Sequence, residues 1–202
     1  AEGLGRVGGR QAVIILRQGL SDGNTSVRIA IVEALGFIGG GLAMTVLSES
    51  LKDNNPEVRI RAVEALKDAG TVNSIPILQK AFGDKSESVR LHAALMLRKI
   101  GHRRGVLVLG KVAVDDKSAA VRAAAASHLG KVGVKDSRAV GILSDVLKDK
   151  DPAVRIRAVE SLGFLQLPQA IEVLRSAIED GDSGVRIRAT EVMGHVLAKD
   201  FE

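Results

Sequence analysis

The chain has 202 residues, of which 46% are hydrophobic and 26% are charged, a composition typical of a globular protein. It contains no Cys, which excludes disulfides, thiolate metal sites and cysteine nucleophiles, and no Trp or Tyr, which disfavours ligand recognition by aromatic stacking. No apolar run reaches the roughly 18 residues that mark a membrane-spanning helix, and the formal net charge is +5.

A repeat organises the whole chain. The dipeptide Val-Arg recurs six times at spacings of 31 to 33 residues, at 27–28, 58–59, 89–90, 121–122, 154–155 and 185–186. The surrounding sequence is similar in each copy, as in VRIAIVEALGFIG and VRIRAVESLGFLQ. A near-constant period of this length predicts stacked copies of one small structural unit.

Each copy reads as two short helices. Apolar or small residues follow the valine at helical spacing, as in Val58, Ala62, Val63 and Leu66, and a second segment with the same period precedes each copy. Side chains suited to cap a helix N-terminus stand three residues before each valine, at Asn24, Asn55, Ser86, Ser118, Asp151 and Asp182. The four prolines, at 56, 76, 152 and 168, all fall near predicted helix starts.

The glycines recur at two positions of the repeat. Twelve residues after the valine they suit a left-handed C-terminal cap, at Gly39, Gly70, Gly101 and Gly133. Nine residues after it they would let two helices approach closely, at Gly36, Gly130, Gly163 and Gly194. We therefore interpret them as repeat positions and not as a flexible linker or a phosphate-binding loop.

The sequence predicts an all-α fold of about six helix pairs in a single repeat domain over residues 1–202. A partial repeat at 1–9 is followed by repeats at about 10–40, 41–71, 72–102, 103–135, 136–167 and 168–202. The first residues, AEGLGRVGG, align with VEALGFIGG at 32–40 and lack the polar cap expected of a terminal repeat. We expect either that the array extends before Ala1 or that its first helix packs on another surface.

An acid recurs with the arginine. An Asp stands five residues before each valine, so that six Asp–Arg pairs share one spacing, and each Asp is placed to accept from an Arg of its own or the adjacent repeat. Six equivalent carboxylates along a repeat array favour a structural role over catalysis. The members of this predicted structural ladder are Asp22, Arg28, Asp53, Arg59, Asp84, Arg90, Asp116, Arg122, Asp149, Arg155, Asp180 and Arg186.

The motif Asp-x-x-x-x-Val-Arg, as in DNNPEVR at 53–59, followed by Ala158 and Leu162-Gly163 in a later copy, resembles HEAT-repeat proteins of the branch named after phycobilisome lyases. The resemblance implies a right-handed α-α superhelix of antiparallel helix pairs, with the second helices lining its concave face. A related enzyme, deoxyhypusine hydroxylase, binds iron through His-Glu pairs. None of the four histidines here is followed by Glu, which argues against that activity and against a metal site.

The predicted concave face would hold the partner-binding residues. Residues three, six or seven and ten positions after each valine should face this side. They include three arginines, each followed three residues later by a Glu, and two phenylalanines. The candidates are Phe37, Arg61, His92, Lys99, Lys131, Arg157, Phe164 and Arg188. For the phenylalanines, two interpretations stay open: packing against the neighbouring repeat, or an apolar anchor for a bound peptide or helix.

Positive charge gathers in the middle of the chain. Residues 88–135 carry ten Lys and Arg but two acids. After the ladder arginines are set aside, a basic patch of Arg98, Lys99, Arg103 and Arg104 remains. It fits either a solvated surface or a site for an acidic partner or nucleic acid through phosphate contacts.

We therefore predict a non-enzymatic scaffold that binds another protein along the concave face, with no cofactor, no metal and no membrane partner. The alternatives are nucleic-acid or acidic-partner binding through the basic patch, and a lyase-like subunit of a bilin-lyase-type complex. We expect a cytoplasmic protein. No signal peptide is visible, although the missing N-terminal Met leaves a removed leader open.

Overall fold

The computed structural model describes residues 2–69, 72–132, 136–165 and 167–198. These residues are mostly helical, and none of them lies in a β-strand. They divide into two compact units, residues 1–100 and 101–202. Each unit is a stack of helix pairs, which confirms the predicted all-α repeat fold.

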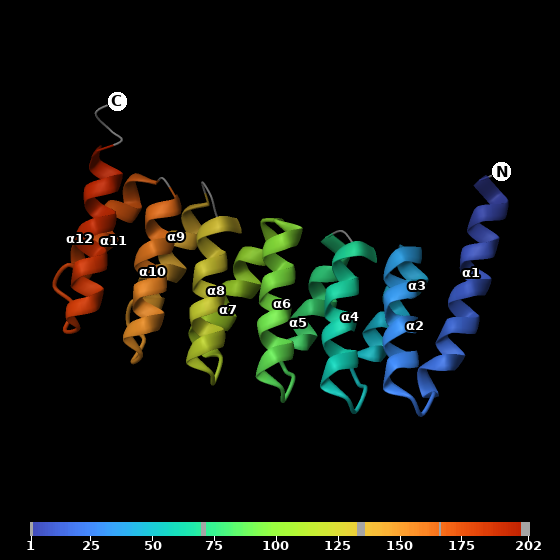
Figure 1. Cartoon of the computed structure of the whole chain (residues 1–202). Helices are drawn as coiled ribbons and strands as arrows, with labels where there is room; N and C mark the ends of the chain where they lie inside the picture. Colours follow the sequence, from blue (N-terminus) through green and yellow to red (C-terminus); the bar gives the residue numbers. More distant parts are fainter. Residues whose placement is uncertain (1, 70–71, 133–135, 166, 199–202) are drawn as a thin grey trace. The chain divides into compact units, whose positions relative to one another are not determined.

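The first unit is built from three helix pairs (Figure 1). Its helices are α1 (Glu2–Gln18), α2 (Thr25–Ile38), α3 (Gly40–Ser50), α4 (Pro56–Ala69), α5 (Ile75–Ala81) and α6 (Glu87–Ile100). Short 3₁₀ turns, Gly19–Ser21 and Val72–Ser74, follow α1 and precede α5. The second helices of the pairs, α2, α4 and α6, pack side by side, and α3 and α5 pack behind α4 and α6.

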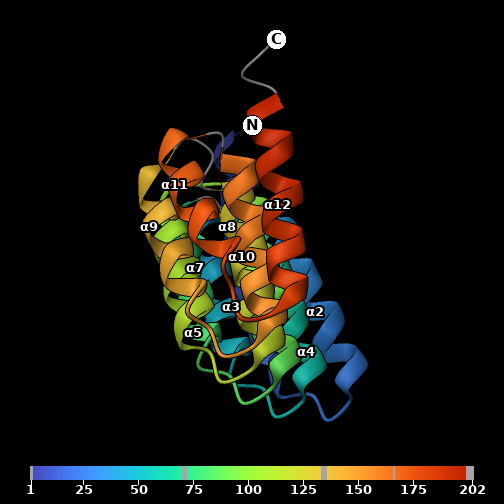
Figure 2. The ribbon, with the colours of Figure 1, turned by 90° about the vertical axis from the view of Figure 1, so that its left-hand side faces the viewer.

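The second unit repeats this arrangement. Its helices are α7 (Arg104–Asp115), α8 (Ala119–Val132), α9 (Ser137–Val146), α10 (Pro152–Leu165), α11 (Pro168–Ala177) and α12 (Ser183–Ala198). Here α8, α10 and α12 pack side by side, while α7, α9 and α11 form the second layer (Figure 2).

The start of the chain differs from the predicted division. α1 runs without a break from Glu2 to Gln18, across the boundary expected between a partial repeat at 1–9 and a repeat at 10–40. No proline interrupts this segment, and its four glycines, each of which costs about 1 kcal/mol relative to Ala, weaken a helix without forbidding it. The local signals are therefore compatible with one long helix.

The recurring valine marks the core of the stack. Val58, Val89, Val121, Val154 and Val185 are fully buried. Val27, the first copy, is 40% exposed, so the six copies are not equivalent. Among the described residues, α2 packs on one second helix, α4, and also contacts α1, whereas α4 packs on two second helices, α2 and α6.

The helix ends follow the predicted capping chemistry. Side-chain oxygens of Asn24, Asn55, Ser118, Asp151 and Asp182 accept hydrogen bonds from backbone N–H groups of the helix that follows. Pro56, Pro152 and Pro168 are first residues of their helices, and Pro76 is the second residue of α5. Gly39 and Gly101 adopt positive φ angles of 65° and 66°, as expected for C-caps, whereas Gly70 and Gly133 lie outside the described residues.

Glycine nine residues after the valine lets neighbouring second helices touch. A Cβ atom added to Gly130 would lie 2.8 Å from the Cα of Ser161, and one added to Gly36 would lie 2.9 Å from the Cβ of Ala65. A Cβ atom added to Gly163 would lie 2.5 Å from the Cγ1 atom of Val192. At Gly194 the space is open, with no described heavy atom within 4 Å.

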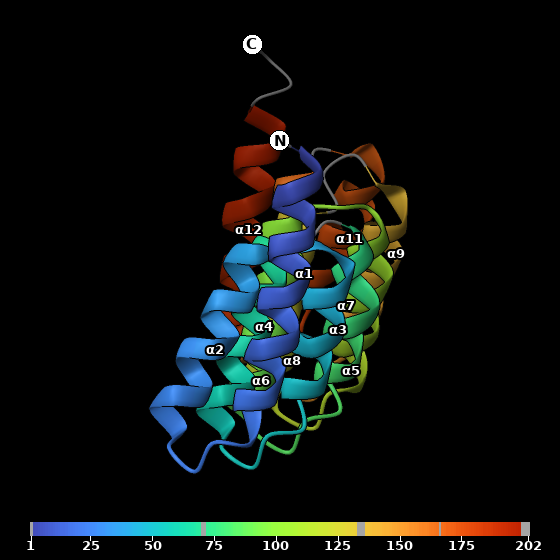
Figure 3. The ribbon, with the colours of Figure 1, turned by 90° about the vertical axis from the view of Figure 1, so that its right-hand side faces the viewer.

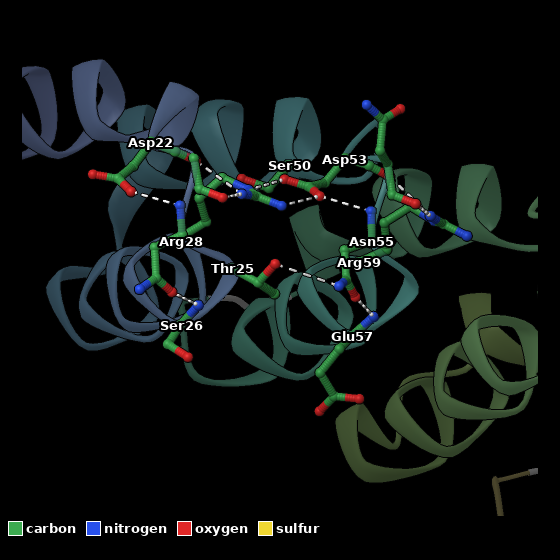
Figure 4. A network of polar contacts seen from close by, with 12 residues as sticks. Asp22, Thr25, Ser26, Arg28, Ser50, Asp53, Asn55, Glu57 and Arg59 are labelled. Carbon is green, nitrogen blue, oxygen red and sulfur yellow. Dashed lines mark hydrogen bonds and ion pairs between the residues drawn. The ribbon is translucent and has the colours of Figure 1, made fainter.

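The Asp–Arg pairs join consecutive repeats (Figure 4). Arg28 donates from Nε and Nη2 to the two carboxylate oxygens of Asp53, at 2.8 and 3.1 Å, and from Nη1 to the backbone carbonyl of Asp22 in its own loop, at 2.8 Å. Arg59 binds Asp84 and the carbonyl of Asp53 in the same manner. In the second unit the pairs are Arg122 with Asp149 and Arg155 with Asp180.

The same carboxylates also shape their own loops. One oxygen of each ladder Asp accepts a hydrogen bond from the backbone N–H two residues later, an Asx turn that presents the N-cap residue. The N–H donors are those of Asn24, Asn55, Ser86, Ser118, Asp151 and Asp182. Each loop is therefore fixed both by its own Asp and by the ladder Arg of the helix that follows the loop.

The pairs hold their acids ionised. Burial opposes ionisation of Asp53, Asp84 and Asp149, but hydrogen bonds from the paired guanidinium and from a backbone N–H outweigh it and lower the pKa of each carboxyl. At Asp180 the hydrogen bond from Arg155 is the largest influence, and it too lowers the pKa. The folded state therefore favours the charged form of all four acids.

We expect Gly130→Ala to destabilise the protein by about 1–3 kcal/mol, because the new methyl group meets the backbone of Ser161 and forces α8 and α10 apart. Gly141→Ala is the matched control. That glycine lies inside α9 with open space around it, so alanine should stabilise by about 0.5–1 kcal/mol. Chemical denaturation measures both, and equal effects of the two substitutions would contradict the close approach.

Asp84→Ala should lower the free energy of unfolding by about 3 kcal/mol, because it leaves the buried Arg59 guanidinium without its carboxylate. Asp22→Ala should cost less than about 1 kcal/mol, because the exposed Asp22 carboxylate accepts only the N–H of Asn24 among the bonds of the described residues. Urea denaturation distinguishes the two variants. A cost at Asp22 equal to that at Asp84 would show that the pairing across repeats contributes nothing.

Acid should weaken the fold through the ladder. Because the four acids have lowered pKa values, the unfolded chain binds more protons, so their contribution to stability is complete above about pH 5 and is lost as the pH falls through and below their ordinary value of 3.8. Denaturation midpoints measured from pH 7 to pH 2 should show this fall. Asp84→Asn, which cannot titrate, should give a shallower dependence, and an unchanged slope would contradict the assignment.

Candidate functional site

Two hollows on the second-helix face are built from the same repeat positions. The α2–α4 site has a volume of about 360 Å³ and is lined by Glu33, Gly36, Phe37, Arg61, Glu64 and Ala65. The α10–α12 site has a volume of about 900 Å³ and is lined by Glu160, Gly163, Phe164, Leu167, Pro168, Ile171, Arg188, Val192, His195 and Val196. In both, one helix supplies Glu-x-x-Gly-Phe and the next supplies Arg.

The repeat geometry explains why these positions meet. Gly36 and Gly163 bring each helix close to its neighbour, which places the Glu of one helix beside the Arg of the next. The phenylalanine that follows each glycine then projects beyond the contact. Phe37 is 87% exposed and Phe164 is 58% exposed, so neither is a buried packing residue.

The α2–α4 site carries an excess of acid. Arg61 donates to Glu64 at 3.0 Å and lies 3.3 Å from Glu57 and 3.9 Å from Glu33. The Nε2 atom of His92, on α6, lies 3.6 Å from Glu64. Three carboxylates thus surround one guanidinium. Such half-exposed ion pairs contribute about 0–1 kcal/mol each to stability, so the main effect of these charged side chains is to make the site locally acidic.

The α10–α12 site balances its charges and is more apolar. Arg157 donates to Glu160 at 2.7 Å, and Arg188 lies 3.2 Å from Glu160 and 3.0 Å from Glu191. Apolar side chains from the start of α11 and from α12 complete the walls. The α2–α4 site, in contrast, is lined by residues of two helices only.

The remaining residues predicted for the concave face lie elsewhere. Lys99 and Lys131 are exposed in the last turns of α6 and α8 and line neither hollow. They occupy the repeat position that holds Phe37 and Phe164 in other repeats. The apolar anchor is therefore confined to the α2–α4 and α10–α12 sites.

The residues of the predicted basic patch belong to different units. Arg98 and Lys99 end α6 in the first unit, and Arg103 and Arg104 lie at the start of α7 in the second. Arg103 lies 3.7 Å from Asp136, a buried acid that also binds Arg138. The hydrogen bond from Arg138 is the largest influence on Asp136 and lowers its pKa. Part of the positive charge is thus already neutralised.

Several residues of the candidate sites were missed in the sequence. Leu167, Pro168 and Ile171 form a wall of the α10–α12 site, but the Leu-Pro pair signalled only a helix start. Asp136 caps α9 and binds two arginines, and its signal was an acid directly before a helix. These residues were missed because they lie between repeats, where the sequence period is weakest.

Two negative observations apply to the described residues only. They contain no group of three or more His, Cys, Asp or Glu side chains that could hold a metal ion. None of their helices is both long and apolar enough to cross a membrane.

Solved structures with this fold include natural and designed repeat proteins. One is the complex of CpcE and CpcF of phycocyanin lyase from Nostoc sp. PCC7120, at 21% identity and a TM-score of 0.56, covering 91% of this chain and 76% of that one. Another is a designed armadillo repeat protein in complex with the peptide (KR)4, at 17% identity and a TM-score of 0.53, covering 89% and 97%. At these identities the likeness shows the fold alone.

Among curated proteins, no sequence matches this chain. The family described as HEAT repeats matches residues 1–55, 44–113 and 106–194, which together span nearly the whole sequence. With the helix pairs of both units and the recurring Asp–Arg contacts already described, the chain belongs to the HEAT repeat family.

Proposed function

We propose that this protein is a non-enzymatic scaffold that binds another protein along the second-helix face, with the α2–α4 and α10–α12 sites as anchors. The observation that carries the proposal is the same Phe-Glu-Arg arrangement, formed twice from equivalent repeat positions, with its phenylalanine largely exposed.

The chemistry of the sites suits a peptide or helix with apolar side chains. Burying Phe164 against a partner's apolar side chain in the α10–α12 site would remove both surfaces from water. The neighbouring Glu and Arg side chains offer hydrogen bonds that fix the orientation of the partner. Because the site is built on packed helices, binding requires little ordering of the scaffold.

Charge favours a basic segment at the α2–α4 site. Three glutamates face one arginine there, so a Lys or Arg beside the apolar anchor of the partner would restore the balance. The designed armadillo repeat protein in complex with the peptide (KR)4 supports this choice, since there a stack of helices with a similar fold binds a peptide of Lys and Arg.

A subunit role is the second candidate. The likeness to the complex of CpcE and CpcF supports a protein partner of comparable architecture. In that case the same hollows would receive a helix of the other subunit and not an extended peptide. The anchor residues, and hence the first experiment, are the same for both.

The test is a selection of binders from a library of displayed peptides, followed by affinity measurement against variants. Selected peptides should share an apolar residue next to Lys or Arg, and Phe164→Ala or the Phe37→Ala/Phe164→Ala double variant should weaken them about tenfold or more. Leu107→Ala is the matched control, because Leu107 is equally exposed on α7, away from both sites. Peptides that bind the double variant as well as the unaltered protein would overturn the proposal.

A further inference from the structure

Within the described residues, each unit has one ladder residue whose side chain makes no pair with the next or the preceding repeat. Arg186, on α12, donates from Nη1 to the backbone carbonyls of Asp180 and Gly181. The other ladder arginines likewise donate from Nη1 to the carbonyl of the ladder Asp in their own loop. Among the described residues, the Nε and Nη2 atoms of Arg186 meet no carboxylate. In the first unit, the Asp22 carboxylate is exposed and accepts the N–H of Asn24, with no guanidinium bound to it in the described part of the chain.

One face of α12 has the residues of an interior repeat surface, and no helix among the described residues packs on it (Figure 2). Thr190 is exposed, whereas Val159, at the same repeat position, is fully buried. Ile187 is 60% exposed, and its counterpart Ile156 is half-buried. Gly194 is open where Gly36, Gly130 and Gly163 each touch the next helix.

A face of the opposite kind lies on α2 in the first unit, where α2 has α1 as a neighbour and no preceding second helix among the described residues (Figure 3). Val27 is 40% exposed although its five counterparts are fully buried. Ala34 is half-buried, whereas three of its five counterparts at this repeat position, Ala65, Met96 and Ser161, are buried. This is the surface that an interior repeat turns toward the repeat before it.

We propose that a second copy of this chain covers these faces, with α12 of one copy packed on α2 of the next. The pairing rules are those seen inside each unit. A ladder Arg reaches the Asp of the following loop, so Arg186 would bind Asp22 of the next copy. The glycine nine positions after the valine touches the residue seven positions after the next valine, so Gly194 would receive Ala34.

Charge and shape agree in this arrangement. A guanidinium with two free donors meets a carboxylate that has no guanidinium partner, and a missing side chain meets a methyl group. The contact uses different surfaces on the two copies, so it is head-to-tail and builds an open chain or a closed ring. It involves other residues than the peptide sites, so Phe164→Ala should leave it unchanged.

Sedimentation velocity measured from micromolar to near-millimolar concentration tests this inference. The average mass should rise with concentration for the unaltered chain, and Arg186→Asp and Asp22→Arg should each weaken the association at least tenfold through like-charge contacts. Mixing equal amounts of these two variants should restore it, since each then offers the other an opposite charge. Lys111→Asp, an exposed charge reversal on α7, is the matched control.

Several outcomes would overturn the inference. These are a monomer at every concentration, association that survives either charge reversal, or a mixture of the two variants that stays monomeric. Helical circular dichroism of each variant at low concentration should match the unaltered chain. The denaturation midpoints should fall only slightly, through the loop bonds that Asp22 and Arg186 make, so that a loss of association reports on the contact and not on the fold.

Discussion

The two-sided bond of the ladder arginine is the interaction on which the structure depends. Its Nη1 atom donates to a backbone carbonyl of the loop that precedes its own helix, while Nε and Nη2 donate to the carboxylate of the next loop. One side chain therefore sets both the shape of a loop and the spacing between repeats. The hydrophobic core of Leu, Val and Ala side chains supplies most of the driving force, but hydrophobic burial is non-directional, so these directional bonds define the register of stacking more sharply.

Function in such a stack arises at positions that neither the core nor the ladder uses. Gly36 and Gly163 alter only the distance between two helices, yet that change brings Glu and Arg of neighbouring repeats together and leaves a phenylalanine outside the contact. In the repeats where Lys99 or Lys131 replaces the phenylalanine, the same framework presents a cation. The chemistry of the surface thus varies while the interior stays constant.

The fold was predictable because the period repeats every structural signal. Valine spacing, N-caps such as Asn24 and Asp151, and C-caps such as Gly39 each recur, so an error in one copy is corrected by the others. The same period predicted Phe37 and Arg61 of the α2–α4 site and Phe164 and Arg188 of the α10–α12 site. Leu167, Pro168, Ile171 and Asp136 were not, because they lie where one repeat joins the next and each occurs without a counterpart. The partial exposure of Val27 could not be predicted either, because a sequence pattern does not show which copy lacks a neighbour.

The ladder bonds also have a reach of one repeat, and this limits how far a change can spread. Arg59 contacts its own loop and the next one, and no ladder bond seen in either unit passes over a helix pair. A duplicated or deleted helix pair would present the same donors and acceptors at its borders as the pair it joins. Recombination between copies of the gene segment would therefore change the length of the array without creating a mismatched junction, which gives this architecture a simple route to evolve longer and shorter forms.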